Sequence, residues 1–132
     1  MKKNVRSTIL VMLILGMLLS SISIAQAGTI EPRYTNIIDL KGTLSISAQG
    51  RATCNGSVQI KSGYTVYLAV ELKRDGTTIK TWLNSGSGTV SAGGTYYVMS
   101  GHTYVVTATA TVYNASGRVV ETQSHSSQER SY

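Results

Sequence analysis

The chain has 132 residues, of which 42% are hydrophobic and 14% are charged, and its formal net charge is +6. This length suits one domain with one core rather than several domains. The basic residues are scattered along the sequence, whereas a protein that binds nucleic acid concentrates them in a patch or stripe. We therefore expect no nucleic-acid partner.

The first 27 residues have the layout of a secretory signal peptide. Three basic residues stand within the first six positions, an apolar run covers residues 9–19, and small residues surround position 27. The apolar run is shorter than the roughly 20 residues that span a bilayer. We expect cleavage after Ala27, secretion of the remainder and no membrane span in the product. An uncleaved anchor is the alternative.

Residues 28–40 are predicted to be an irregular lead-in, because Pro32 discourages regular structure around it. From residue 41 onward, apolar and polar residues alternate with a period of two, and Thr, Val, Tyr and Ile dominate the alternating runs. Such residues suit pleated sheets. The pattern predicts that residues 41–132 form one all-β domain, an immunoglobulin-like antiparallel β-sandwich of about seven strands.

A first hairpin is predicted around Asp75 and Gly76. This dipeptide lies between two alternating runs and suits a two-residue turn with positive φ at both positions. A regular register beyond the turn places Glu71 opposite Lys80 on the outer face. The same register brings Trp82 diagonal to Tyr67, within reach of its ring.

A second hairpin is predicted at residues 114–118. A three-residue loop with Gly117 in the left-handed region pairs Val112 with Val120. In that register Val120 faces the core and Glu121 stays in water.

Two further residues have predicted structural roles. Tyr104 opens a long alternating strand, where immunoglobulin-like sandwiches often anchor a corner through a tyrosine hydroxyl. Cys54 is the single cysteine, so no intramolecular disulfide forms, and we expect a buried thiol. An exposed Cys54 that links two chains is the alternative. We otherwise expect a monomer or a weak dimer.

Several of these stretches occur together in one known family. "EPRYTNI", "LSISAQGRATCNGSV", "VELKRDGTTIKTW" and "YYVMSGHTYVVTATATVY" follow in this order. The chain thereby resembles a family of small exported proteins of Gram-positive, clostridia-like bacteria, catalogued as a domain of unknown function. The resemblance covers nearly the whole sequence after the signal. It implies export and a sandwich-like fold, and it implies no activity.

The sequence offers no catalytic constellation. His102 and His125 have no Cys, Asp or Glu at metal-ligand spacing, and a thiolate pair of Cys54 with His102 lacks a supporting motif. The acidic residues are spread along the chain. We expect no enzymatic activity, no metal and no cofactor.

Aromatic residues are the one feature that suggests a ligand. The chain contains one Trp and eight Tyr but no Phe, and tyrosine contacts ligands at low entropic cost. We predict an extracellular binding module that contacts carbohydrate or a cell-wall polymer through Tyr67 and Trp82. If the register slips by one residue, Trp82 becomes a core residue instead. The alternative function is a secreted effector, antagonist or inhibitor that binds a protein partner through loops such as residues 84–94.

Overall fold

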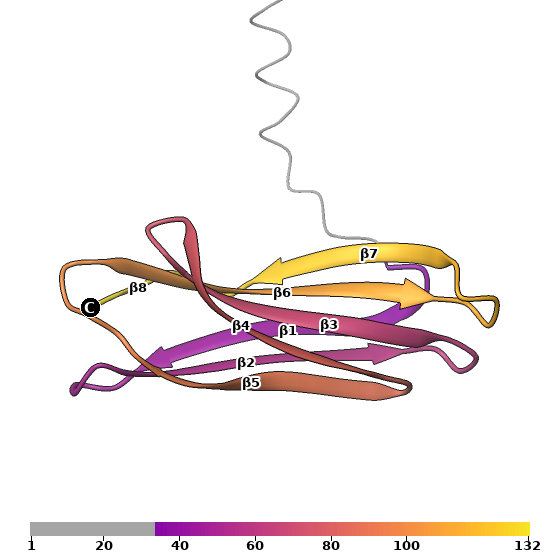
Figure 1. The fold of residues 1–132 in the computed structure, drawn as a ribbon, viewed down its shortest axis with the longest axis horizontal. Coiled ribbons are helices and arrows are strands. Elements are labelled where there is room, and N and C mark those ends of the chain that lie inside the picture. The colour runs from indigo at the N-terminus through magenta and orange to yellow at the C-terminus, as the bar shows by residue number, and fades with distance from the viewer. Residues whose placement is uncertain (1–33) are drawn as a thin grey trace, which may run out of the picture. The chain divides into compact units, whose positions relative to one another are not determined.

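The computed structural model describes residues 34–132 (Figure 1). The predicted signal peptide, residues 1–27, lies outside this range. The described residues form eight strands and no helix. The strands are β1 (Ile37–Ile46), β2 (Arg51–Ile60), β3 (Thr65–Arg74), β4 (Thr77–Gly86), β5 (Thr89–Tyr97), β6 (Thr103–Tyr113), β7 (Val119–Ser126) and β8 (Arg130–Ser131).

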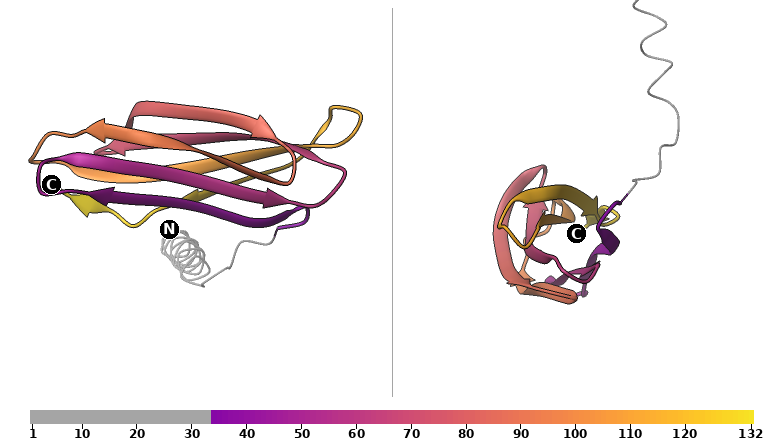
Figure 2. Two further views of the ribbon diagram at one scale, coloured as in Figure 1. Left: turned by 90° about the horizontal axis from the view of Figure 1, so that it is seen from below. Right: turned by 90° about the vertical axis from the view of Figure 1, so that its right-hand side faces the viewer.

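The strands form two antiparallel sheets. Sheet A has the order β1-β2-β5, and sheet B has the order β4-β3-β6-β7, with β8 also pairing with β6. The two sheets face each other as layers in Figure 1, and the end-on view of Figure 2 shows both sheets around one core. This arrangement confirms the predicted all-β, immunoglobulin-like sandwich. The two-residue β8 is additional to the strands that the sequence predicts.

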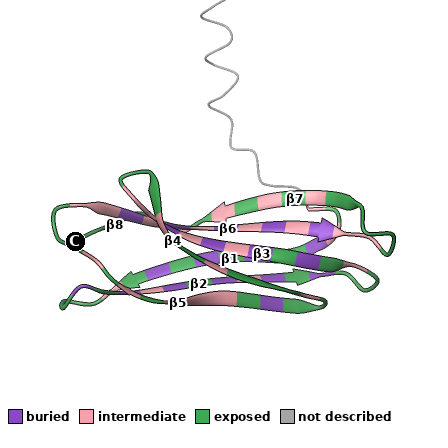
Figure 3. Cartoon of the chain, in the orientation of Figure 1, coloured by how far each residue is buried: buried purple, intermediate pink, exposed green. Residues whose placement is uncertain are grey.

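The core consists of alternate residues on the inner faces of the two sheets. Along β6, buried positions alternate with half-buried ones, as Figure 3 shows. The period-two pattern of the sequence therefore predicts the inner faces of β2, β3 and β6 correctly. The fully buried large side chains are Tyr104, Leu68, Leu72, Val58, Val66, Val70, Val106, Val112 and Cys54.

Small residues allow the sheets to pack closely near their middle. Gly42 of β1 lies opposite Gly56 of β2. A side chain on Gly56 would overlap Val70 of sheet B, and a Cβ on Gly42 would lie 3.1 Å from the carbonyl oxygen of His125. Gly56 therefore leaves the room that Val70 of sheet B occupies, and Gly42 gives a close approach between β1 and β7.

Tyr104 has the predicted corner role. Its side chain is buried, and its hydroxyl donates to the carbonyl oxygen of Met99 at 2.7 Å and accepts from the Met99 N–H at 3.1 Å. These two hydrogen bonds fix the β5–β6 connection to the start of β6 and leave no unsatisfied phenol oxygen.

Cys54 is buried in β2, as the sequence predicts. Burial raises the pKa of its thiol to about 11, because the apolar surroundings disfavour the thiolate. The thiol therefore stays protonated and inert, and its position does not expose sulfur to a second chain.

The β3–β4 hairpin has the predicted turn but a different register. Asp75 and Gly76 both have positive φ, 49° and 87°. Beyond the turn, Ile79 is an extra residue in β4 and forms a β-bulge. The side chains that follow it in β4 therefore lie on the opposite face of the sheet from the predicted one. The observed pairs beyond the bulge are Leu72 with Lys80, Glu71 with Thr81, Val70 with Trp82 and Ala69 with Leu83.

This bulge overturns the predicted outer-face contacts. Glu71 does not face Lys80; its carboxylate accepts a hydrogen bond from the Thr78 hydroxyl at 2.8 Å instead. Trp82 lies on the inner side of the sheet and packs against the edge of the core. The predicted pairing of Tyr67 with Trp82 is therefore wrong, and the alternative in which the register slips by one residue is correct.

The β6–β7 hairpin likewise has the predicted turn but a different register. Gly117 has a φ of 81°, and the Asn114 N–H donates to the Arg118 carbonyl at 2.9 Å, so the predicted three-residue loop is correct. Val120 then forms a bulge. It is 42% exposed rather than buried, and Glu121 faces the inner side rather than water. The pairs on either side of the bulge are Tyr113 with Val119 and Val112 with Glu121.

The inward Glu121 anchors the start of β1. Its carboxylate accepts hydrogen bonds from three consecutive backbone N–H groups, those of residues 35–37, at 2.7–3.2 Å. Partial burial alone would raise the pKa of this carboxyl, but these N–H donors and the Gln123 amide together lower it. Farther along β7, Nδ1 of His125 accepts from the Gly42 N–H at 3.0 Å.

These contacts move the boundary of the domain. Strand β1 begins at Ile37, so the last four residues of the predicted lead-in, 37–40, are strand. Within β1, the Ile37 and Gly42 N–H groups donate to side chains of β7. Neither Pro32 nor the local alternation predicts this longer strand, because the side chains that anchor it come from β7.

Candidate functional site

The outer face of sheet B carries Tyr67 but not Trp82. Trp82 is half-buried, and a Cβ built on Gly94 of β5 would lie 2.6 Å from its Nε1 atom. The indole thus lies directly against the β5 backbone and closes the seam between β4 and β5. The Lys80 ammonium lies 5.9 Å from its ring centroid, within cation–π range.

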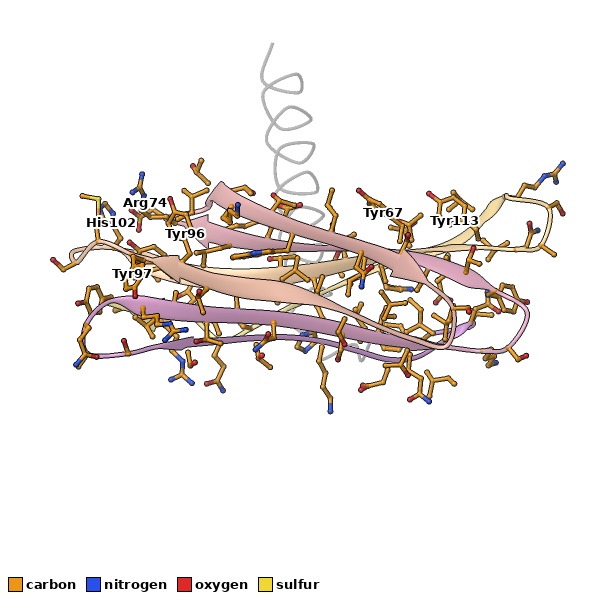
Figure 4. The ribbon with its side chains drawn as sticks, turned by 60° about the horizontal axis from the view of Figure 1, so that its bottom comes forward. Tyr67, Arg74, Tyr96, Tyr97, His102 and Tyr113 are labelled. Carbon is orange, nitrogen blue, oxygen red and sulfur yellow. The ribbon has the colours of Figure 1, made fainter. Side chains whose placement is uncertain are left out.

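The aromatic neighbour of Tyr67 is Tyr113 of β6. Tyr67 pairs with Thr111, and Tyr113 pairs with Thr65, so the two tyrosines are diagonal neighbours on one face of adjacent strands. Figure 4 shows them together at one end of the sandwich. Tyr67 is 40% exposed and Tyr113 is half-buried.

The two tyrosines border a shallow depression of about 300 Å³. Its remaining lining comes from β3 and from the end of β4, namely Thr65, Val66, Ser85 and Gly86. The lining thus combines aromatic rings with hydroxyl groups and contains no charged residue.

Short hydroxyl side chains continue this face across β6 and β7. Thr107, Thr109 and Thr111 alternate with the buried residues of β6. The bulge at Val120 turns Thr122 and the following serines outward to meet them. The cross-strand pairs are Thr111 with Thr122, Thr109 with Ser124 and Thr107 with Ser126.

Sheet A has a separate hollow on its own outer face. It measures about 450 Å³, and its lining includes Lys41, Asn55, Ser57 and Gly93. Gly93 has a φ of 146°, and a side chain there would overlap the carbonyl oxygen of Cys54. The glycine is therefore required by the close approach of β5 to β2. This hollow is larger than the depression beside Tyr67, but it is polar and contains no aromatic ring.

At the end of the sandwich opposite Tyr67, the side chains of Asp75 and His102 form a polar contact. A ring nitrogen of His102 lies 2.5 Å from a carboxylate oxygen of Asp75, and the Thr103 N–H donates to the other oxygen at 3.0 Å. The Thr103 N–H and the His102 ring hold the pKa of the Asp75 carboxyl below its ordinary value. These bonds connect the β3–β4 turn to the β5–β6 corner, so Asp75 has a second structural role besides its turn.

Exposed apolar side chains also gather near this end. Tyr97 is 72% exposed and Met99 is 65% exposed. In Figure 4, Tyr97 lies at the same end as Arg74 and His102, away from Tyr67. The stretch 84–94, which the sequence suggests as a contact loop, is mostly strand, because β4 ends at Gly86 and β5 begins at Thr89.

No protein-family model matches the chain, and no curated protein matches it. Within residues 34–132, no three His, Cys, Asp or Glu side chains gather as metal ligands would. The same part of the chain contains no helix long and apolar enough to cross a bilayer. The candidate site therefore rests on the geometry of the surface alone.

Sequence reasoning found Tyr67 and missed Tyr113. The alternation along this strand indicates the side on which Tyr113 lies, because Tyr113 is an even number of residues from Thr107, Thr109 and Thr111 and so points to the same face. In immunoglobulin-like sandwiches the third and sixth strands are neighbours. That neighbourhood puts Tyr67 and Tyr113 on the same outer face of adjacent strands, but their closeness also depends on the β3–β6 register, which the structure gives.

Proposed function

We propose that this chain is an exported, non-catalytic binding module that recognises carbohydrate through the outer face of sheet B. The observation that carries the proposal is the pair of Tyr67 and Tyr113 beside an uncharged depression lined with hydroxyl groups. Export rests on the signal-like first 27 residues and not on the fold.

The chemistry of the depression suits a sugar ring. The face of an aromatic ring is electronegative, and the axial C–H groups of a pyranose present a weakly positive apolar face to it. The phenol groups and the hydroxyls of Thr65 and Ser85 then donate to and accept from the equatorial hydroxyls of the sugar. A few polar groups around an aromatic surface are the usual composition of a small-molecule site.

The hollow on sheet A suits a sugar less well. It offers the Lys41 ammonium, amide and hydroxyl groups, but no surface on which the apolar face of a ring can stack. Lys41 is also engaged by Asp39, at 3.6 Å. We therefore assign the candidate site to the smaller depression on sheet B.

A second function, a secreted effector or inhibitor that binds a protein partner, has a specific observation in its favour. Tyr97 and Met99 are strongly exposed at the end of the sandwich opposite Tyr67. Tyrosine and methionine are enriched at protein interfaces. In this alternative the contact is made by the β5–β6 corner rather than by residues 84–94.

Replacing Tyr67 tests the proposed function. We expect Tyr67→Ala to weaken binding to a panel of soluble cell-wall polysaccharides by about 30-fold, the effect of losing a central aromatic contact. Titration calorimetry measures this affinity. Tyr97→Ala is the matched control, because it removes a more exposed tyrosine at the other end.

The alternatives give different results in this experiment. Equal polysaccharide affinity of Tyr67→Ala and the unmodified chain contradicts the proposed site. Loss of binding only in Tyr97→Ala moves the site to the β5–β6 corner. Thermal unfolding of both variants checks that neither substitution, at an exposed position, unfolds the sandwich.

A further inference from the structure

The β6 and β7 strands carry three rows of hydroxyl pairs on the outer face of sheet B. The rows follow the antiparallel register, so each of three threonines of β6 has a threonine or serine of β7 directly beside it. The rows, from the tyrosine end, are Thr111–Thr122, Thr109–Ser124 and Thr107–Ser126. We call these six residues the hydroxyl track.

The track begins at the proposed sugar site. Thr111, in its first row, is also the cross-strand partner of Tyr67 on β3. Successive rows are two residues apart, which is about 6.7 Å along a strand, so the track extends about 13 Å from the level of Tyr67. This distance exceeds the length of one sugar ring. A ligand that fills it has to be a chain of sugars.

The hydroxyl pairs retain hydrogen-bonding capacity for a ligand. The Thr109 and Ser124 hydroxyl oxygens lie 3.0 Å apart, and those of Thr107 and Ser126 lie 3.1 Å apart. Within each pair one O–H donates to its neighbour, which leaves the other O–H and several lone pairs free. Each row can therefore both donate to and accept from a sugar hydroxyl.

Charge on this face is confined to its far end. Glu71 pairs with Thr107 and Lys73 pairs with Val105, while the rows of Thr109 and Thr111 carry no charged residue between β4 and β7. The Glu71 carboxylate is itself hydrogen-bonded to Thr78. A polymer with an anion on every sugar would find no cation along most of the track.

From this arrangement we infer that the ligand is a neutral, extended polysaccharide that lies along β6. One sugar stacks on Tyr67 and Tyr113, and the following sugars bind the hydroxyl track. This inference rests on the proposed function, which supplies the stacking site, and it adds the class, direction and minimum length of the ligand. The track residues are short, so a chain can lie flat on them next to the taller tyrosines.

A length series of oligosaccharides tests the inference. The probes are β-linked glucose oligomers from the monosaccharide to the hexasaccharide, with uronic-acid oligomers of the same lengths. The variant is Thr109→Val with Ser124→Ala, which removes the middle hydroxyl pair and keeps residues that suit a strand or a small exposed position. Thr53→Val, on the outer face of sheet A, is the matched control.

We expect the affinity of the unmodified chain to rise with length in the glucose series and to be lower for each matched uronate. In the double variant the longer glucose oligomers should bind about 10-fold more weakly, because the hydrogen bonds of one row are lost. The shortest oligomers should bind both proteins equally. Thr53→Val should behave as the unmodified chain.

Three results overturn the inference in different ways. If the double variant keeps the full gain with length while Tyr67→Ala abolishes binding, the hydroxyl track is not a ligand site and the proposed function stands. If uronates bind as tightly as glucose oligomers, the ligand is not restricted to neutral chains. If no oligomer binds and Tyr67→Ala changes nothing, the proposed function fails as well. Equal unfolding midpoints of all variants exclude a folding defect.

Discussion

At the scale of single residues, the position of Trp82 depends on a glycine in the other sheet. The indole packs where Gly94 of β5 has no side chain, so the two residues close the β4–β5 seam together. Asn84 adds a second link across the same seam, because its Nδ2 atom donates to the Ser91 carbonyl at 2.8 Å. No backbone ladder joins β4 to β5, so these side-chain contacts hold the edges of the sheets together.

Gly94→Ala should therefore displace Trp82. The added methyl group would lie 2.6 Å from Nε1 of the indole, and overpacking of this kind costs about 1–3 kcal/mol of unfolding free energy. We expect a lower urea midpoint and red-shifted Trp82 emission, because the displaced ring meets water. Ser91→Ala, on the outer side of the same strand, is the control. An unchanged emission spectrum in Gly94→Ala would show that the indole is not held against β5.

At the scale of the elements, both hairpins have the turns that their sequences predict, and both then depart from the predicted register. Asp75-Gly76 and Gly117 are readable because positive φ restricts the residue type. The bulges at Ile79 and Val120 are formed by β-branched residues, which are common in any strand, so the residue type does not predict them. Local alternation favours Val120 inside and Glu121 outside. Packing overrides it, because β7 lies at a sheet edge where an inward carboxylate can reach the N–H groups of β1.

The anchoring of β1 by Glu121 should make the sandwich sensitive to acid. The folded state lowers the pKa of Glu121, so it binds fewer protons than the unfolded chain, and the stabilisation is present above the ordinary pKa of about 4.3. It is lost as the pH falls through the folded-state pKa. Urea unfolding at a series of pH values measures this dependence.

Glu121→Gln separates this effect from general acid denaturation. We expect a loss of about 1–2 kcal/mol near neutral pH, because hydrogen bonds from three backbone N–H groups lose their ionic acceptor in a partly exposed site. We expect the difference from the unmodified chain to shrink toward acid pH. Glu129→Gln, at an exposed position, is the control. A constant difference between Glu121→Gln and the unmodified chain at all pH values would contradict the assigned role.

At the scale of the whole described domain, three surfaces compete for the role of binding site. They are the aromatic and hydroxyl face of sheet B, the polar hollow on sheet A around Gly93, and the exposed corner at Tyr97 and Met99. The sequence predicts the sandwich and one residue of the first surface, Tyr67. It does not predict Tyr113 as the partner, because the contact is made between strands that are distant in the chain.

Chemical-shift mapping discriminates between these surfaces in one experiment. The isotope-labelled protein is titrated with a neutral glucose oligosaccharide, and the backbone amide shifts of all residues are followed. The proposal predicts that the perturbed amides cluster on the outer face of sheet B, around Tyr67, Thr109 and Tyr113. Perturbation centred on Gly93 or on Met99, with sheet B unaffected, would contradict it.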